Sequence, residues 1–180
     1  IAINKGNFLL AYRVCTTQAE FRRIAICQLD SNFELIENSV IAFSDEISFG
    51  DLEREPTLNE RAFSWHADPR IFRLKGSFYL QWNDGANKPF NNQFLIRISE
   101  EGHPIAPAKL VVIRNKSRRQ VEKNWMFFEE ADQVYVEYAS SKPNRTILKA
   151  DIESSNLYIL CDWCQTSNQA NTTYENLFGE

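Results

Sequence analysis

Residues 65–82 of the chain, WHADPRIFRLKGSFYLQW, have the pattern of a β-hairpin. Two apolar, aromatic-rich runs flank the sequence Lys75-Gly76-Ser77, and glycine is the residue that tight turns favour. Pro69 fits the head of a strand, because the first residue of a strand can do without its ladder hydrogen bond. The segment therefore predicts two short antiparallel strands, with Asp68-Pro69-Arg70 at the start of the first.

The same pattern occurs again along the chain. Residues 122–138, EKNWMFFEEADQVYVEY, align with it when Asn124 is placed on Asp68, and residues 131–133 then fall on the first turn. A partial copy, residues 1–12, opens the sequence. Repeats of this size are typical of stacked supersecondary units.

Each copy is followed by further strand-like segments, so that each unit has four predicted strands. The added segments are 22–30 and 34–43 in the first unit, 94–99 and 110–113 in the second, and 145–151 and 157–162 in the third. Residues 44–61 are acidic and irregular, and they predict a connection that can include a short turn of helix. Four antiparallel strands in each unit of about 50 to 60 residues predict the blades of a β-propeller.

We therefore expect an all-β chain that forms a single partial propeller domain. Blade one covers about residues 1–55, blade two about 56–120 and blade three about 121–165, followed by a connection to a missing blade over about 166–180. Three blades do not close a ring, so the remaining blades would come from the same longer chain or from a second copy. The alternative fold is an irregular β-sandwich.

The composition argues against several classes of protein. The net charge of −4 disfavours a nucleic-acid binder, and the basic run 114–119 is expected to be a solvated loop. No segment approaches the roughly 18 apolar residues of a membrane span.

The four cysteines predict neither a metal site nor a redox centre. Cys161 and Cys164 form a lone Cys-x-x-Cys, without a second pair or a nearby histidine. Cys15 and Cys27 lie in apolar strand-like segments and are expected to be small buried residues. We expect the thiols to be reduced, as in a cytoplasmic protein.

The propeller topology predicts one cluster of polar and aromatic side chains. The starts of the first strands and the ends of the second strands meet on one face, around the central axis. Carboxylates, cations and tryptophans in a polar funnel suit an oligosaccharide or sugar conjugate, because hydroxyls need hydrogen-bond partners and sugar rings stack on indole. The predicted site residues are Arg13, His66, Asp68, Arg70, Trp82, Asp84, Glu122, Lys123, Asn124 and Trp125.

Two motifs carry a resemblance to a known group of proteins. Residues 65–70, WHADPR, with the aromatic run 78–80 behind them, resemble the inner-strand motif of five-bladed propeller carbohydrate-active enzymes. These comprise glycoside hydrolases, mannoside phosphorylases and β-mannosyltransferases. Residues 122–125, EKNW, resemble the motif of the next blade. The resemblance implies a five-bladed ring, a site at the axial funnel and, preferentially, a mannoside-type substrate.

Three reaction types fit the predicted residues. Inverting hydrolysis needs two carboxylates about 6.5–9.5 Å apart, for which Asp68 and Glu122 are the candidates. Phosphorolysis needs one general acid and a cationic cradle for phosphate, and glycosyl transfer needs a similar cradle for a nucleotide sugar. The residues for such a cradle are Arg13, His66, Arg70 and Lys123. The cation-rich set leans toward phosphorolysis or transfer, with no cofactor other than phosphate or a nucleotide sugar as co-substrate.

Structural explanations stay open beside the functional ones. Arg70 can pair with Asp68 or Glu122 across neighbouring inner strands. Trp82 and Trp125 can be core residues between blades, and His66 can be a structural hydrogen-bond donor. The chain as a whole can also be a non-catalytic propeller module that binds a glycan or a protein partner.

Overall fold

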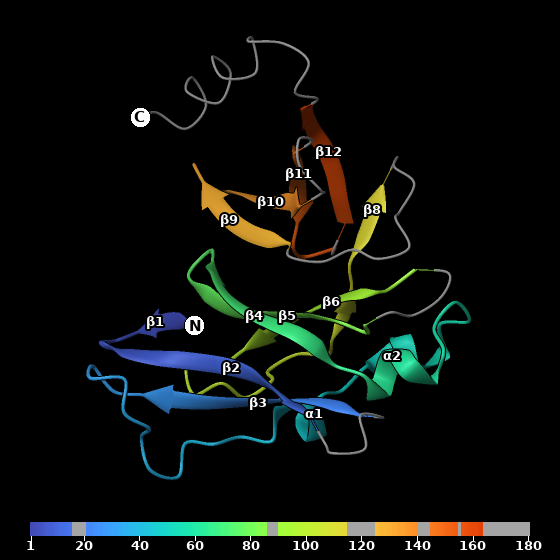
Figure 1. The fold of residues 1–180 in the computed structure, drawn as a ribbon. Coiled ribbons are helices and arrows are strands. Elements are labelled where there is room, and N and C mark those ends of the chain that lie inside the picture. Colours follow the sequence, from blue (N-terminus) through green and yellow to red (C-terminus); the bar gives the residue numbers. More distant parts are fainter. Residues whose placement is uncertain (16–20, 86–89, 115–124, 140–144, 155, 164–180) are drawn as a thin grey trace.

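The structure is a computed structural model that describes residues 1–15, 21–85, 90–114, 125–139, 145–154 and 156–163. These residues are mostly β-strand with little helix, and they form three sheets, which we number in chain order (Figure 1). The all-β prediction is confirmed at this level. Within the described segments, no helix has the length and apolar character needed to cross a membrane.

Sheet 1 has three antiparallel strands in the order β1-β2-β3. They are β1 (Ala2–Asn4), β2 (Asn7–Cys15) and β3 (Arg22–Leu29). The prediction of a fourth strand over residues 34–43 is wrong, because the β-pairing of this segment with β3 is limited to isolated bridges at Leu35 and Ile41. Asn38 lies between the two bridges with φ +59°, which interrupts an extended strand. Cys27 is buried as predicted, whereas Cys15 at the end of β2 is exposed.

The connection between sheets 1 and 2 contains short helices. They are α1 (Phe43–Glu46), the 3₁₀ helix η1 (Gly50–Arg54) and α2 (Glu60–Ser64). Asn59 caps α2, because its side chain accepts a hydrogen bond of 3.1 Å from the backbone N–H of Arg61. The prediction of a short helical turn in this connection is confirmed.

Sheet 2 is antiparallel in the order β4-β5-β6-β7, and sheet 3 has the order β8-β12-β11-β10-β9. The strands of sheet 2 are β4 (Ala67–Leu74), β5 (Ser77–Asn83), β6 (Gln93–Ile98) and β7 (Lys109–Leu110). Those of sheet 3 are β8 (Val112–Arg114), β9 (Met126–Glu130), β10 (Gln133–Ala139), β11 (Arg145–Asp151) and β12 (Asn156–Trp163).

The single strand predicted over residues 110–113 is divided between two sheets. Val111 separates β7 from β8, and β8 pairs with β12 in parallel. Val111 is 1% exposed in the core between sheets 2 and 3. The chain therefore passes from sheet 2 to sheet 3 at this buried residue. The sheets consequently have three, four and five strands rather than four each.

A two-residue turn joins the first two strands of each unit. Residues 5–6, 75–76 and 131–132 form these turns, and all six residues have positive φ. The flanking residues pair directly with each other in all three hairpins. Such turns match the twist of the paired strands, which is why tight hairpins favour them. The repeat seen in the sequence is therefore a repeat of hairpins.

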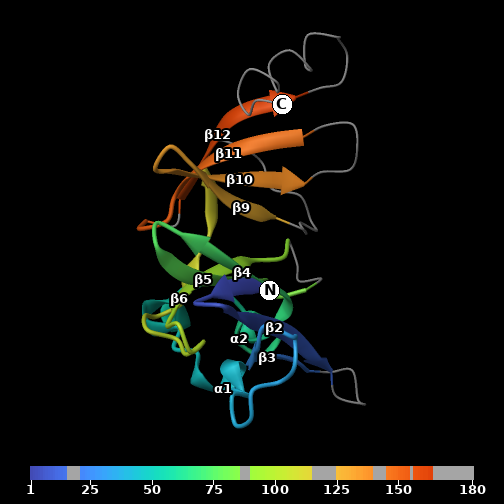
Figure 2. The same cartoon turned by 90° about the vertical axis from the view of Figure 1, so that its left-hand side faces the viewer.

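The three sheets are stacked, with sheet 2 in the middle (Figures 1 and 2). Phe78, Leu80 and Trp82 of β5 lie in the core shared with sheet 1. Tyr79 of β5 and Leu95 of β6 lie in the core shared with sheet 3. Alternate residues of a strand point to opposite faces, so the middle sheet is buried on both.

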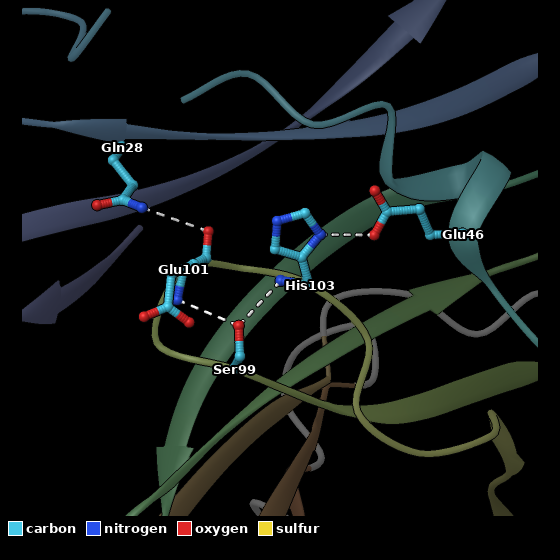
Figure 3. Close-up of polar contacts among 5 residues, drawn as sticks. All are labelled: Gln28, Glu46, Ser99, Glu101 and His103. Carbon is cyan, nitrogen blue, oxygen red and sulfur yellow. Dashed lines mark hydrogen bonds and ion pairs between the residues drawn. The ribbon is translucent and has the colours of Figure 1, made fainter. Parts of the chain in front are cut away.

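The loop between β6 and β7 connects sheet 2 to sheet 1 through polar contacts (Figure 3). Ser99 Oγ accepts hydrogen bonds from the backbone N–H groups of Glu101 (3.2 Å) and His103 (3.3 Å). The side-chain amide of Gln28 donates to the Glu101 carbonyl oxygen at 3.5 Å, and His103 Nδ1 lies 2.7 Å from Glu46 Oε2. The loop thus contacts both β3 and α1.

Candidate functional site

Asp68 lies in a β-bulge at the start of β4. The register of β4 against β5 shifts between Ala67 and Arg70, so Asp68 and Pro69 together lie opposite Trp82. Asp68 has φ +52°. Non-glycine residues rarely adopt this conformation, and a following proline restricts them further. Bulges re-aim side chains and are common next to active sites, where strained residues also gather.

Two side chains from neighbouring strands hold the Asp68 carboxylate. Arg13 Nη1, near the end of β2, lies 3.2 Å from Asp68 Oδ1. Asn83 Nδ2, at the end of β5, lies 3.4 Å from Asp68 Oδ2. The side chains of Arg13 and Asp68 are each 37% exposed, so the carboxylate is oriented and still open to solvent. The structure thus brings together two of the predicted site residues from different sheets.

Asn83 is part of this arrangement, although it was not among the predicted site residues. Its side chain is 2% exposed, and its Oδ1 accepts a hydrogen bond of 2.9 Å from the backbone N–H of Gly85. This bond leaves the NH₂ group of Asn83 directed toward Asp68. Its place at the end of the second strand is the signal by which it could have been found.

Arg70 is partly exposed on β4, two residues after Asp68. It pairs with Gln81 of β5 beyond the bulge. Arg70 therefore lies on the same strand segment as the carboxylate, as a second guanidinium after Arg13.

His66 is fully buried beneath this segment. Its Nδ1 lies 2.7 Å from Ser44 Oγ, and its ring packs against Trp82 at 5.7 Å between centroids. Burial, with a smaller contribution from the positive charge of Arg23, lowers the pKa of His66 to about 4. The side chain is neutral at pH 7 and cannot serve as a cation for phosphate. We assign it to the structural support of β4, the alternative that the sequence left open.

Trp82 and Trp125 are core residues in this structure. Trp82 is 0% exposed and stacks on Phe94 at 5.3 Å between centroids. Trp125 is 1% exposed and packs against Tyr138 at 5.5 Å. A sugar ring needs an open indole face, so neither side chain is available as a stacking platform.

Asp84 is also buried, and its carboxylate is hydrogen-bonded to Asn92. It is 0% exposed, and its carboxylate accepts hydrogen bonds from the backbone N–H (2.6 Å) and the side-chain NH₂ (2.7 Å) of Asn92. These bonds tie the end of β5 to the start of β6. Asp84 therefore supports the site and does not present its carboxylate to a ligand.

The predicted site residues of the third unit, Glu122, Lys123 and Asn124, lie outside the described residues. Strand β9, which begins at Met126, contacts β4. The approach of residues 122–124 to Asp68 stays a prediction. Across the part of the chain that the structure describes, no three His, Cys, Asp or Glu side chains are grouped so that they could hold a metal ion.

Comparison with known proteins finds similarity in structure alone. No family model matches the sequence, and no curated protein matches it. Three of the solved structures that are similar to it are glycoside hydrolases.

Two of these structures are GH43 enzymes. CoXyl43, a β-xylosidase/α-arabinofuranosidase from a compost microbial metagenome in complex with xylotriose, has a TM-score of 0.57 at 11% identity, over 88% of this chain and 53% of its own. The GH43 enzyme from Xanthomonas citri, also complexed with xylotriose, has a TM-score of 0.56 at 12% identity, over 88% of this chain and 52% of its own.

The third is a family 117 glycoside hydrolase from the marine bacterium Zobellia galactanivorans. Its TM-score is 0.54 at 13% identity, over 87% of this chain and 44% of its own. The chain thus spans about half the length of the structures that it matches. At identities of 11–13% the likeness shows the fold alone: the described sheets are arranged as in β-propeller glycoside hydrolases.

Proposed function

We propose that this chain carries the substrate-binding face of a glycan-active enzyme that cleaves a glycosidic bond, with Asp68 at its centre. The observation that carries the proposal is the strained bulge at Asp68, where φ is +52° and the carboxylate is held by two donors. The shared fold with glycoside hydrolases supports the proposal. In a propeller of this kind the three sheets would be consecutive blades of a five-bladed ring.

The chemistry of Asp68 suits contact with a sugar. Each carboxylate oxygen accepts one hydrogen bond from the protein and retains capacity for a second. The half-exposed carboxylate can therefore bond a hydroxyl or exchange a proton with a glycosidic oxygen. In this proposal Asp68 is the general acid or the sugar-hydroxyl anchor, and Arg13 and Arg70 donate to hydroxyls or to an anionic group.

Hydrolysis is the reaction that we favour. The lean toward phosphorolysis or transfer depended partly on His66 as a cation, and burial keeps that side chain neutral at pH 7. A hydrolase needs a second carboxylate, and Glu122 is the residue that we propose for it. For inversion the two carboxyl groups would be about 6.5–9.5 Å apart. The substrate type is to be sought among mannosides, which the sequence motif favours, and xylosides, because two similar structures contain xylotriose.

The test is to measure turnover and binding of the same substrates by the wild type and by Asp68→Asn. The panel is aryl mannosides, aryl xylosides and the corresponding oligosaccharides, each with and without inorganic phosphate. We expect Asp68→Asn to lose about 10²–10⁴-fold in kcat/KM, the usual contribution of a general acid or base, while binding persists. Asp51→Asn, an exposed position on η1, is the matched control and should keep full activity.

Release of a sugar phosphate in place of the free sugar would show phosphorolysis instead of hydrolysis. Unchanged turnover in Asp68→Asn would contradict the assignment of Asp68. Saturable glycan binding without turnover on any substrate would favour the alternative, a non-catalytic propeller module.

A further inference from the structure

Two arginine side chains lie over the ring of Trp65, immediately before the strand that carries Asp68. Arg61 Cζ is 3.9 Å from the ring centroid, and Arg22 Cζ is 4.8 Å from it. Arg22 opens β3, Arg61 belongs to α2, and Trp65 follows α2 directly. All three residues are partly exposed.

Neither arginine is neutralised by an acidic side chain in the described part of the chain. There, Arg13 and Arg23 form ion pairs with Asp68 and Asp45, whereas Arg22 and Arg61 form none. The Nε of Arg61 donates a hydrogen bond of 3.2 Å to a backbone carbonyl oxygen, which leaves its two terminal NH₂ groups for other partners. Both cations thus lie over one aromatic ring, and no acidic side chain of the described residues forms an ion pair with either of them.

The position of Trp65 is defined by backbone hydrogen bonds to both arginines and by a close contact with Gly85. The backbone N–H of Trp65 bonds to the Arg61 carbonyl oxygen at 3.0 Å, and that of His66 bonds to the Arg22 carbonyl oxygen at 2.8 Å. Gly85 packs against the indole edge so closely that a Cβ there would lie 2.3 Å from Trp65 Nε1. The indole edge thus lies directly against the backbone of Gly85.

The arginine pair lies at the same end of the sheets as Asp68. Arg22 pairs with Cys15 at the end of β2, the strand that supplies Arg13. The carbonyl oxygen that Arg61 contacts belongs to Asp84, next to Asn83. Figure 1 shows the end of β2, the starts of β3 and β4, the end of β5 and helix α2 on one side of the molecule.

We propose that Arg22 and Arg61 together bind an oxyanion of the ligand that occupies the Asp68 site. The ligand class is an acidic sugar, whose carboxylate would be the oxyanion, or a phosphate group. The planar guanidinium matches both groups with two parallel donors, and stacking on indole orients it before binding. This inference deepens the proposed function and depends on it for the sugar, but the anion site can be tested without turnover.

The test measures binding of three small probes to the full chain at constant ionic strength. Glucuronate carries a sugar carboxylate, inorganic phosphate carries the oxyanion alone, and glucose is the neutral reference. Calorimetry gives Kd, and the Nε–Hε signals of arginine in ¹H–¹⁵N spectra report which side chains respond. We expect saturable binding of glucuronate or phosphate, and none of glucose.

Matched variants assign the site. Arg22→Gln and Arg61→Gln should each weaken binding by about 10- to 100-fold, the loss expected for a hydrogen bond to a charged group. Arg54→Gln, an exposed arginine on η1, should leave Kd unchanged. Arg22→Lys and Arg61→Lys keep the charge and lose the planar fork, so they should also weaken binding if a glutamine variant does not fold.

The outcomes separate the two ligand sources and the two proposals. Tighter binding of glucuronate than of phosphate would identify an acidic sugar, and the reverse order would identify a phosphate group. Asp68→Asn should still bind the oxyanion probe, whether or not the wild type shows turnover. Absence of saturable binding, or equal weakening by Arg54→Gln, would overturn the inference.

Discussion

Asp68 adopts a backbone conformation that residues other than glycine disfavour, and the next residue is a proline. Holding a residue in such a conformation costs about 1–3 kcal/mol, which the surrounding structure must supply. Arg13 and Asn83 contact its carboxylate, yet a half-exposed ion pair contributes only about 0–1 kcal/mol. The contacts of the carboxylate thus do not offset the strain of the backbone. Residues that keep such strain are common at functional sites.

Two substitutions at this position measure the strain. Asp68→Gly and Asp68→Ala both remove the carboxylate, and they differ in their tolerance of φ +52°. We expect the glycine variant to be the more stable by about 1 kcal/mol, measured by urea unfolding. At Asp51 on η1 the order should be reversed, because glycine is the less stable residue in a helical position. If the alanine variant were the more stable at position 68 as well, Asp68 would be unstrained.

His66 predicts a loss of stability in mild acid. Its pKa is about 4 in the folded chain, against 6.5 for an unburied histidine. The unfolded chain therefore takes up the proton first, and the free energy of unfolding falls as the pH drops from about 6.5 to 4, by at most about 3 kcal/mol. Above pH 6.5 this group contributes no pH dependence.

The measurement is the free energy of unfolding between pH 4 and 7. His66→Gln should flatten the part of the curve that this residue causes. The chain has one other histidine, His103, whose contact with Glu46 is exposed. His103→Gln is therefore the control, and a flatter curve in that variant alone would contradict the prediction.

The three hairpin turns share one backbone conformation with positive φ, and the third turn has an alanine in it. Ala131 has φ +47°, where glycine or asparagine is preferred. Ala131→Asn should raise the free energy of unfolding by about 0.5–1 kcal/mol in thermal or urea unfolding. Gly76→Ala, in the equivalent turn, should lower it, because no atom lies near enough to that position to obscure the backbone effect. A gain from Gly76→Ala would contradict this account of the turns.

A second prediction at the scale of elements concerns the loop between β6 and β7, which is drawn in Figure 3. Gly102 has φ +102°, and a Cβ there would lie 2.7 Å from Ile26 Cγ2 in the core of sheet 1. Gly102→Ala should therefore destabilise the chain by about 1–3 kcal/mol, through backbone strain and overpacking together. Glu101→Ala, at the neighbouring exposed position, is the control and should change stability by less than about 0.5 kcal/mol. An equal effect of the two variants would show that the close contact with Ile26 is unimportant.

The local features of these elements were predictable from the sequence, and the non-local ones were not. The signals of a hairpin, which are turn residues and alternating apolar runs, involve only residues that are near one another in the sequence. The hairpins around residues 75–76 and 131–132 were therefore predicted correctly. The segment 110–113 was predicted as one strand, because only burial of Val111 between two sheets divides it. The strand predicted over 34–43 failed for a similar reason, since a left-handed residue at Asn38 is invisible in the apolar pattern.

The site shows the same division. The topology placed Arg13 and Asp68 on one face, and the ion pair between them lies there. Sequence alone does not reveal which aromatic face is covered, and Trp82 and Trp125 are both core residues. It also did not single out Trp65 with its two arginines, because they come from three separate elements.

At the scale of the whole molecule, sheet 1 has a face on which large apolar side chains of the described residues are exposed. Ile3 is 68% exposed and lies opposite Phe8, whose ring stacks on Phe33 at 4.5 Å between centroids; Phe33 is itself 60% exposed. Leu9, the residue after Phe8, is 0% exposed on the other face, toward sheet 2. In the stack, sheet 2 is covered on both faces. We therefore propose that a further blade of the propeller covers Ile3 and Phe33.

This proposal predicts that residues 1–180 alone self-associate or bind an apolar dye. Sedimentation should show species larger than a monomer, or dye fluorescence should rise on addition of the protein. Ile3→Thr with Phe33→Ser should reduce either signal. Ile105→Thr, at a residue that is 51% exposed elsewhere, should not. A monomer without dye binding would contradict the proposal.

The central claim is that a sugar binds at the Asp68 bulge. The most direct measurement is a crystal structure of Asp68→Asn soaked with the oligosaccharide that the wild type turns over or binds. The account predicts sugar hydroxyls within hydrogen-bond distance, about 3 Å, of residue 68 and Arg13. A sugar bound at another face, with the side chain at position 68 directed away from it, would contradict the account.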